Sequence, residues 1–165
     1  MASRRDQIKM SDAELAAFLD EQKVMQCATV GPSGRPHLVP LWFVADTPPG
    51  TPSRAQAGAA ELRGWTYAAS QKAKNLERDA RATLGIDDGV EYQELRGVMF
   101  ECDVEVEHET ERVAEYGLEL FARYAGDLGE EIRAMVAKQA TKRVGLRFKP
   151  TRTVTWDHRK LDGTY

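Results

Sequence analysis

The chain contains little cysteine, and its cysteines and histidines do not fall into any ligand pattern. Its 165 residues include two cysteines, Cys27 and Cys102, and both lie in strand-like stretches. We expect two buried free thiols, as in a protein of a reducing compartment. A disulfide between them stays open but has no support from the spacing. The three histidines are scattered, so the sequence predicts no metal site.

Long apolar runs and nucleotide-binding motifs are also missing. No run of about 18 apolar residues is present, so we expect no membrane-spanning helix. The first ten residues, MASRRDQIKM, have no apolar core after the arginines, and we therefore expect a cytoplasmic rather than a secreted protein. A net charge of −3 gives no basis for nucleic-acid or membrane-surface binding. There is no G-x-G-x-x-G and no P-loop, which removes the Rossmann and nucleoside triphosphate classes.

What the sequence does contain is the composition of one soluble domain. Apolar residues make up 42% and charged residues 30% of the chain, values typical of a globular protein. The length suits a single domain spanning residues 1–165. Short β-type runs outnumber the amphipathic helices, which predicts a mainly β fold, a β-barrel with flanking helices.

Helices and strands can be placed from their local signals. Ser11 and Glu14 form a capping box, which begins a helix expected over residues 11–22. Two further helices, 109–125 and 130–138, make a helical insert over 109–138. Residues 46–61 are rich in turn formers, and we expect a flexible loop there or a flap near the site. Strands are expected at residues 24–30, 36–45, 65–67, 81–87, 95–107, 143–149 and 153–156, with the last two separated at Pro150.

Two of these strands have an unusual distribution of apolar and charged side chains on their two faces. The run HLVPLWFV within residues 36–45 is apolar on both sides, which suits barrel core on one side and a ligand or partner subunit on the other. Pro40 removes a ladder donor and so predicts an edge or a bulge; Trp42 and Phe43 suit ordinary core equally well. Residues 95–107 alternate apolar and acidic side chains, and we expect the acidic face to be solvated rather than to hold a metal.

A strand-to-helix corner stands out within GWTYAASQKAKNLERDARATL, residues 64–84. Trp65, Thr66 and Tyr67 are strand formers, and Ser70 is a good helix N-cap. Lys72 and Asn75 fall in or beside the first turn. A helix N-terminus with a hydroxyl and a lysine favours an anion, so one interpretation is a phosphate site. The other is an ordinary cap followed by a solvated lysine. Ala73, Leu76 and Ala80 recur at helical spacing and should form the packing face of this helix.

Three blocks of sequence carry a resemblance to a known family. They are Thr66-x-x-x-Ser70-x-Lys72-x-x-Asn75-Leu76, the run Gly34 to Phe43, and the tail Val154 to Tyr165. In this order they resemble the flavin-binding split-barrel superfamily, which includes pyridoxamine phosphate oxidase and the flavin/deazaflavin-dependent oxidoreductases. The tail WDHRKLDGTY is similar to the actinobacterial branch that uses the deazaflavin coenzyme F-420.

The resemblance implies a six-stranded split β-barrel that forms a homodimer, with the cofactor at the subunit interface. In such a protein Ser70, Lys72 and Asn75 would bind the cofactor phosphate, and Lys74 or Arg78 would contact a longer anionic tail. The alternative for Lys74 and Arg78 is surface pairing with neighbouring acidic residues. The other cofactor-binding residues that the resemblance implies are Val39, Pro40 and Leu41 along the ring, Thr66 and Tyr67 beside the corner, and Trp156 and Lys160 from the C-terminal segment.

The chain departs from the vitamin oxidases at two points. Gln71 stands where those enzymes usually carry arginine, and His158-Arg159-Lys160 replaces their Arg-x-His element. We therefore expect an F-420-dependent oxidoreductase that transfers hydride to a small unsaturated or quinone-like acceptor. FMN-dependent chemistry on the same fold, and non-catalytic binding of a flavin, deazaflavin or haem, remain alternatives. No catalytic side chain is predicted, because a cofactor of this type carries the redox chemistry itself.

Overall fold

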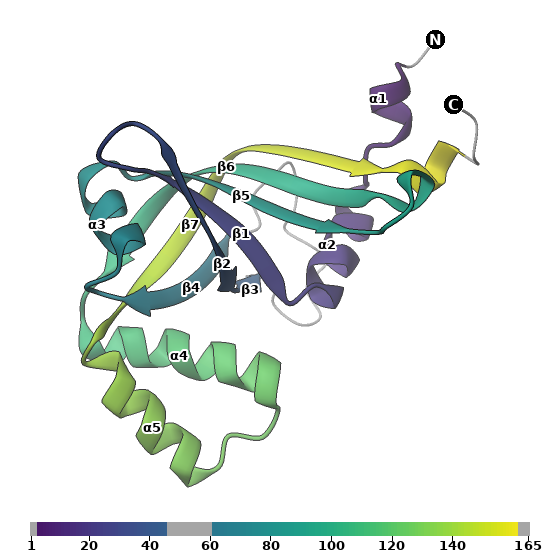
Figure 1. Ribbon diagram of the computed structural model, residues 1–165. Helices are drawn as coiled ribbons and strands as arrows, with labels where there is room; N and C mark the ends of the chain where they lie inside the picture. The colour runs from purple at the N-terminus through teal and green to yellow at the C-terminus, as the bar shows by residue number, and fades with distance from the viewer. Residues whose placement is uncertain (1–2, 46–60, 162–165) are drawn as a thin grey trace.

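A single curled antiparallel sheet forms the centre of the protein (Figure 1). The computed structural model describes residues 3–45 and 61–161. The sheet has seven strands in the order β2-β1-β5-β6-β7-β4-β3, so the predicted mainly β barrel with flanking helices is confirmed. The strands are β1 (Val24–Val30), β2 (Pro36–Trp42), β3 (Val44–Ala45), β4 (Leu62–Tyr67), β5 (Arg81–Asp88), β6 (Arg96–Glu107) and β7 (Arg143–Asp157).

The strand predicted over residues 36–45 is divided, and this division closes the barrel. β2 pairs with β1 at one edge of the sheet, whereas β3 pairs with β4 at the opposite edge. Phe43 lies between them, fully buried. A Cβ built on Gly64 of β4 would lie 3.1 Å from both the Leu41 side chain and the Trp42 carbonyl, so the two edges approach closely there. Counting β2 and β3 separately gives seven strands instead of the predicted six. Pro40 lies in an edge strand, as predicted.

The predicted separation of the last two strands at Pro150 is wrong. β7 is continuous from Arg143 to Asp157. Pro150 lies opposite Cys102, whereas Glu101 pairs with Arg152, so Thr151 is an extra residue in β7. This bulge accommodates a residue that cannot donate to the ladder.

The helices flank the barrel at its two ends and along one side (Figure 1). The capping box at Ser11 is present, and Leu15, Phe18 and Leu19 of the helix that follows it are buried. The helix after Ser70 ends at Arg78, so Ala80 is exposed and does not belong to its packing face. The helices are α1 (Arg4–Gln7), which the sequence did not predict, α2 (Asp12–Glu21), α3 (Gln71–Arg78), α4 (Thr110–Ala125), α5 (Glu130–Ala140), η1 (Tyr92–Glu94) and η2 (His158–Leu161).

Two apolar clusters hold these elements together. The larger one fills the barrel and includes Phe18, Phe100, Phe148 and both cysteines. The smaller one lies between β4 and the pair α4–α5, and its buried members are Trp65, Val113, Leu120, Val136 and Ala140.

Both cysteines are buried and free, as predicted. Burial raises the pKa of Cys27 to about 11 and that of Cys102 to about 12. Because the thiolate is the nucleophile and the metal ligand, neither thiol is activated for such chemistry at neutral pH.

The acidic face of β6 is ion-paired at the surface. Glu105 pairs with Lys149 and Arg147, and Glu101 pairs with Arg152 at 2.8 Å.

Over residues 3–45 and 61–161, no group of three or more His, Cys, Asp and Glu side chains is placed to hold a metal ion. None of the helices in that part of the chain is long and apolar enough to cross a membrane. The loop predicted over residues 46–61 lies outside the described residues, except for Glu61.

Candidate functional site

The corner between β4 and α3 has the geometry of an anion site. The Ser70 hydroxyl caps α3 by accepting a hydrogen bond from the Ala73 amide at 3.2 Å. It also lies 3.3 Å from the Thr66 hydroxyl. In the described part of the chain, the amides of Gln71 and Lys72 have no acceptor. Two free N–H groups at the positive end of a helix are available to bind a negatively charged group.

Lys72 is buried at this corner, with only 5% of its surface exposed. Its ammonium and the Cys27 thiol lie close enough to influence each other, and burial lowers the pKa of Lys72. Among the described residues no hydrogen-bond acceptor or carboxylate pairs with its ammonium. A buried charge without a counter-ion is costly, and an anionic ligand would remove that cost. Lys72 is therefore a mostly buried residue and not an extended surface lysine, and the residues at the corner fit a phosphate.

Asn75 has a different position from the one expected. It is fully buried, and its amide nitrogen donates to the Thr29 hydroxyl at 3.0 Å. Its amide oxygen accepts from Gln71 at 2.8 Å and from Arg78 at 3.3 Å. With both ends of the amide occupied, Asn75 connects α3 to β1. These bonds position the corner, and the second hydrogen of the Asn75 amide nitrogen is left over from the bond to Thr29, so its predicted contact with a phosphate stays a prediction.

The two basic residues expected to contact an anionic tail differ in their surroundings. Lys74 is exposed on the outer face of α3. Arg78 donates to the Val30 carbonyl of β1. Asp79 forms its ion pair with Arg81, at 2.7 Å, and the charge of Arg78 acts on it more weakly, helping to lower the pKa of its carboxyl. Lys74 therefore remains available to a ligand that extends beyond the corner.

A hollow of about 270 Å³ lies between β2, β4 and the helical pair α4–α5. Pro40 and Leu41, both predicted site residues, line it together with the aromatic rings of Trp42, Trp65 and Phe121. Trp42 is 46% exposed and stacks on Tyr124 with ring centres 4.2 Å apart, so it is not ordinary core. The half-buried Val39 precedes this lining on β2.

Sequence reasoning missed the polar residues of this hollow, Arg143 and Gln139. The Arg143 guanidinium lies 4.0 Å from the ring centre of Tyr67 and 4.4 Å from that of Trp65. Two nitrogens of Arg143 donate to the Gln139 side-chain oxygen, at 2.8 and 3.0 Å. These residues come from the end of α5 and the start of β7. No local pattern marks them, because only the packing of α5 brings them to β4.

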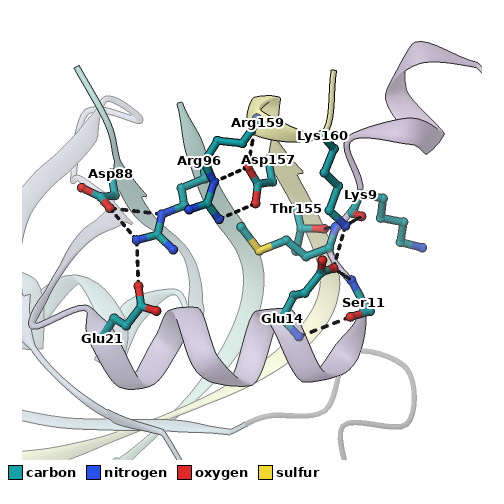
Figure 2. Close-up of polar contacts among 11 residues, drawn as sticks. Lys9, Ser11, Glu14, Glu21, Asp88, Arg96, Thr155, Asp157, Arg159 and Lys160 are labelled. Atoms are coloured by element: carbon teal, nitrogen blue, oxygen red, sulfur yellow. Dashed lines mark hydrogen bonds and ion pairs between the residues drawn. The ribbon is translucent and has the colours of Figure 1, made fainter. Parts of the chain in front are cut away.

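The C-terminal end of β7, which contains Trp156, and the short helix η2, which contains Lys160, lie at the opposite end of the barrel from α3 (Figure 1). Lys160 donates to the Lys9 carbonyl at 2.7 Å and to Glu14 at 2.6 Å (Figure 2). Trp156 pairs with Gly97 across β6 and β7, and its indole ring covers that glycine so closely that a Cβ there would lie 2.4 Å away. Within one chain neither residue joins the corner, so their predicted role requires a second subunit.

Other charged residues, from α2, β5, β6, β7 and η2, lie at the same end of the barrel as Lys160 (Figure 2). Arg96 pairs with Glu21 at 2.7 Å and with Asp88 at 2.8 Å. Arg159 pairs with Asp157 at 2.6 Å, and the hydrogen bonds from Arg159 lower the pKa of this carboxyl. Each carboxylate here has a basic partner, which indicates a structural role in joining the N-terminal segment to the end of the barrel.

A second hollow, of about 380 Å³, lies over β1, β5 and β6. Its charged lining residues are Arg81, Glu101 and Asp103. None of the predicted site residues lines it, and Arg81 and Glu101 already have ion-pair partners. The corner and the aromatic hollow are therefore the better candidates for a functional site.

Comparison with known proteins identifies the family. Residues 11–157 match the family model of pyridoxamine 5'-phosphate oxidase. The chain belongs to this family. It has the flavin-binding split-barrel fold that the three sequence blocks predicted. No functionally curated protein matches the chain.

Solved structures extend the comparison. A conserved hypothetical protein from Mycobacterium tuberculosis is 38% identical, with a TM-score of 0.83 over 99% of this chain and 95% of that one. A protein named F420 reductase is 22% identical, with a TM-score of 0.61 over 83% and 93%. The haem storage protein HutZ from Vibrio cholerae is 20% identical, with a TM-score of 0.63 over 87% and 93%. At these last two identities the likeness shows the fold alone.

Membership of the pyridoxamine 5'-phosphate oxidase family gives the α3 corner a chemical context. FMN and F-420 each carry a phosphate, and the residues present at the corner fit one. Lys72 supplies a positive charge, while Ser70 and two free amides supply hydrogen-bonding groups. The comparison does not by itself distinguish FMN from a deazaflavin.

Proposed function

We propose that this protein is an oxidoreductase that uses coenzyme F-420 for hydride transfer to a small unsaturated or quinone-like acceptor. The observation that carries the proposal is the buried residue Lys72 at the N-terminus of α3, whose ammonium has no anionic partner in the described residues. A cation in that position is costly for the protein alone. A cofactor phosphate would offset that cost.

The predicted residues have different roles in binding and positioning the cofactor. Lys72, Ser70 and the free amides of α3 bind the phosphate, and Thr66 holds the Ser70 hydroxyl in place. Asn75 fixes α3 against β1. Lys74 contacts the acidic tail by which F-420 exceeds FMN in length. The backbone of β2 at residues 39–41 and the side chain of Tyr67 line the ring.

The chemistry belongs to the cofactor, and the chain supplies binding, orientation and exclusion of water. Lys72, Ser70 and the free amides of α3 would hold reduced F-420, which would supply the hydride for one carbon of the acceptor's double bond, and solvent would supply the proton for the other carbon. Apolar and aromatic side chains around Pro40, Leu41 and Trp42 would keep water from the reacting carbon.

A homodimer is part of the proposal, because it would bring the partner subunit's Trp156 and the partner subunit's Lys160 to the cofactor. Its support is an apolar row on the outer face of β1 and β2. Leu38 is 61% exposed and lies opposite Ala28, and Val24, 46% exposed, lies opposite Trp42. An exposed apolar face of this kind is typical of a protein interface.

The test is a titration of the purified protein with F-420 and, in parallel, with FMN, followed by fluorescence. We expect tight F-420 binding that falls at least about tenfold in Lys72→Ala, since a charged contact to phosphate is lost. Lys74→Ala is the matched control. It should weaken F-420 moderately and leave FMN unchanged.

The other outcomes separate the alternatives. Preferential binding of FMN would assign the protein to flavin chemistry on the same fold. Tight binding with no turnover of any acceptor would favour a binding protein, a role that the fold shared with HutZ allows. Binding of neither cofactor would contradict the proposal.

A further inference from the structure

The aromatic hollow carries a positive charge that nothing in the cofactor assignment uses. Arg143 is held in place on three sides, by the rings of Tyr67 and Trp65 and by the side-chain oxygen of Gln139. Stacking on two rings and a double hydrogen bond to one oxygen fix the plane of its guanidinium. The guanidinium group of Arg143 is therefore already ordered before any ligand binds.

No carboxylate pairs with Arg143 within residues 3–45 and 61–161. Eight of the thirteen other arginines in that range have such a partner within 4.0 Å, namely Arg63, Arg81, Arg96, Arg112, Arg123, Arg147, Arg152 and Arg159. Gln139 is neutral, so it orients the guanidinium without neutralising it. The charge of Arg143 is thus available to an anion.

The other walls of the hollow are formed by flat, apolar side chains. Trp42, Trp65, Phe121, Pro40 and Leu41 provide rings and carbon surfaces. Trp42 is fixed by stacking on Tyr124 and by an edge contact with Phe121. A volume of about 270 Å³ lies just below the ~300–1,000 Å³ typical of small-molecule sites. It therefore suits one small ring system.

We infer that this hollow binds a small planar carboxylate, aromatic or conjugated, with its ring among the tryptophans and its carboxylate on Arg143. A carboxylate matches the guanidinium fork in shape and charge. A conjugated ring matches the aromatic walls. The inference rests on the proposed function in one respect, since such an anion would be the class of acceptor that the enzyme reduces.

The binding test needs neither cofactor nor turnover. The chain has three tryptophans, and two of them, Trp42 and Trp65, line the hollow. In a Trp156→Phe background the fluorescence therefore comes from the hollow alone. We would titrate this protein with cinnamate and with cinnamamide, which has the same ring and chain but no charge. Cinnamate should quench the fluorescence and bind at least about tenfold more tightly than cinnamamide.

Arg143→Gln should abolish this preference, because it removes the charge and leaves the rings. Lys138→Gln is the matched control, since it removes an exposed positive charge from α5 outside the hollow, and it should bind cinnamate like the parent. Equal affinity for cinnamate and cinnamamide in the parent would overturn the inference. That comparison holds even if Arg143→Gln does not fold.

Cofactor titrations of Arg143→Gln distinguish this inference from the proposed function. Unchanged affinity for F-420 or FMN would support an acceptor site that adjoins the cofactor ring at Pro40 and Leu41 and in which Arg143 binds only the acceptor. A tenfold loss of cofactor affinity would overturn it by assigning Arg143 to the cofactor. If neither cofactor binds to the parent but cinnamate binds through Arg143, the proposed function fails and the carboxylate site stands.

Discussion

Lys72 bears on both stability and binding. The residue is only 5% exposed, and its ammonium has no anionic partner in the described residues. We predict that Lys72→Met stabilises the ligand-free protein by about 1 kcal/mol or more, since an apolar side chain replaces an uncompensated buried charge. This corresponds to a rise of roughly 2–4 °C in Tm. The same variant should lose cofactor binding. Lys74→Met, on the exposed face, should change Tm little, and a lower Tm for Lys72→Met would contradict this account.

The pH dependence of stability follows from the same residue. Burial places the folded-state pKa of Lys72 below its usual value of 10.5. Between the two pKa values the unfolded chain binds more protons than the folded one, so the free energy of unfolding rises as pH increases towards 10.5. We predict that the stability advantage of Lys72→Met shrinks over this alkaline window. Urea denaturation at a series of pH values measures it, and an advantage independent of pH would argue against a depressed pKa.

Asn75 is predicted to act through α3 rather than on the ligand. Asn75→Ala would leave the Thr29 hydroxyl without its buried partner, at a cost of about 1–3 kcal/mol. Thr29→Val removes the same bond from the other side. In a double-mutant cycle the two changes should couple by about 0.5 kcal/mol or more, because both break one interaction. Strictly additive effects on the free energy of unfolding would exclude this connection.

At the scale of elements, the contact between α4 and β4 depends on a glycine. A Cβ on Gly117 would lie 2.6 Å from the Trp65 ring and 2.8 Å from Val136. We predict that Gly117→Ala destabilises the protein, because overpacking costs about 1–3 kcal/mol while helix propensity returns at most about 1 kcal/mol. Gly129→Ala is the control, since no atom lies within 4 Å of its Cβ position. Denaturation midpoints compare the two, and equal midpoints would contradict the predicted clash.

The strands and helices also show where local sequence patterns predict the structure and where they do not. The capping box at Ser11 and the alternating pattern of β6 were sufficient for α2 and β6, because caps and periodicity act within a few residues. The unbroken strand predicted over residues 36–45 and the separation predicted at Pro150 were wrong for one common reason. An apolar run does not reveal that its two halves pair with different strands, and a proline in a strand does not reveal whether a bulge will accommodate it.

At the scale of the whole molecule, the proposed dimer makes a prediction about Leu38. This side chain is 61% exposed in the apolar row of β1 and β2. Leu38→Glu would place a charge from each subunit in the proposed interface, so we expect monomers in sedimentation velocity and weaker cofactor binding. Val90→Glu, at an 89% exposed position on the β5–β6 turn, should leave the association state unchanged. A wild-type protein that sediments as a monomer would contradict the proposed interface.

The sequence alone determined the β-rich class, the helix caps and the Ser70–Lys72 corner, because each depends on residues close together in the chain. The tertiary structure decided what the corner's side chains do. It buried Lys72, it bound Asn75 to Thr29, and it placed Lys160 at the far end of the barrel beside Glu14. It also brought Arg143 onto Tyr67 and Trp65. Such contacts join residues far apart in the chain, and only closure of the barrel and packing of α4 and α5 bring them together.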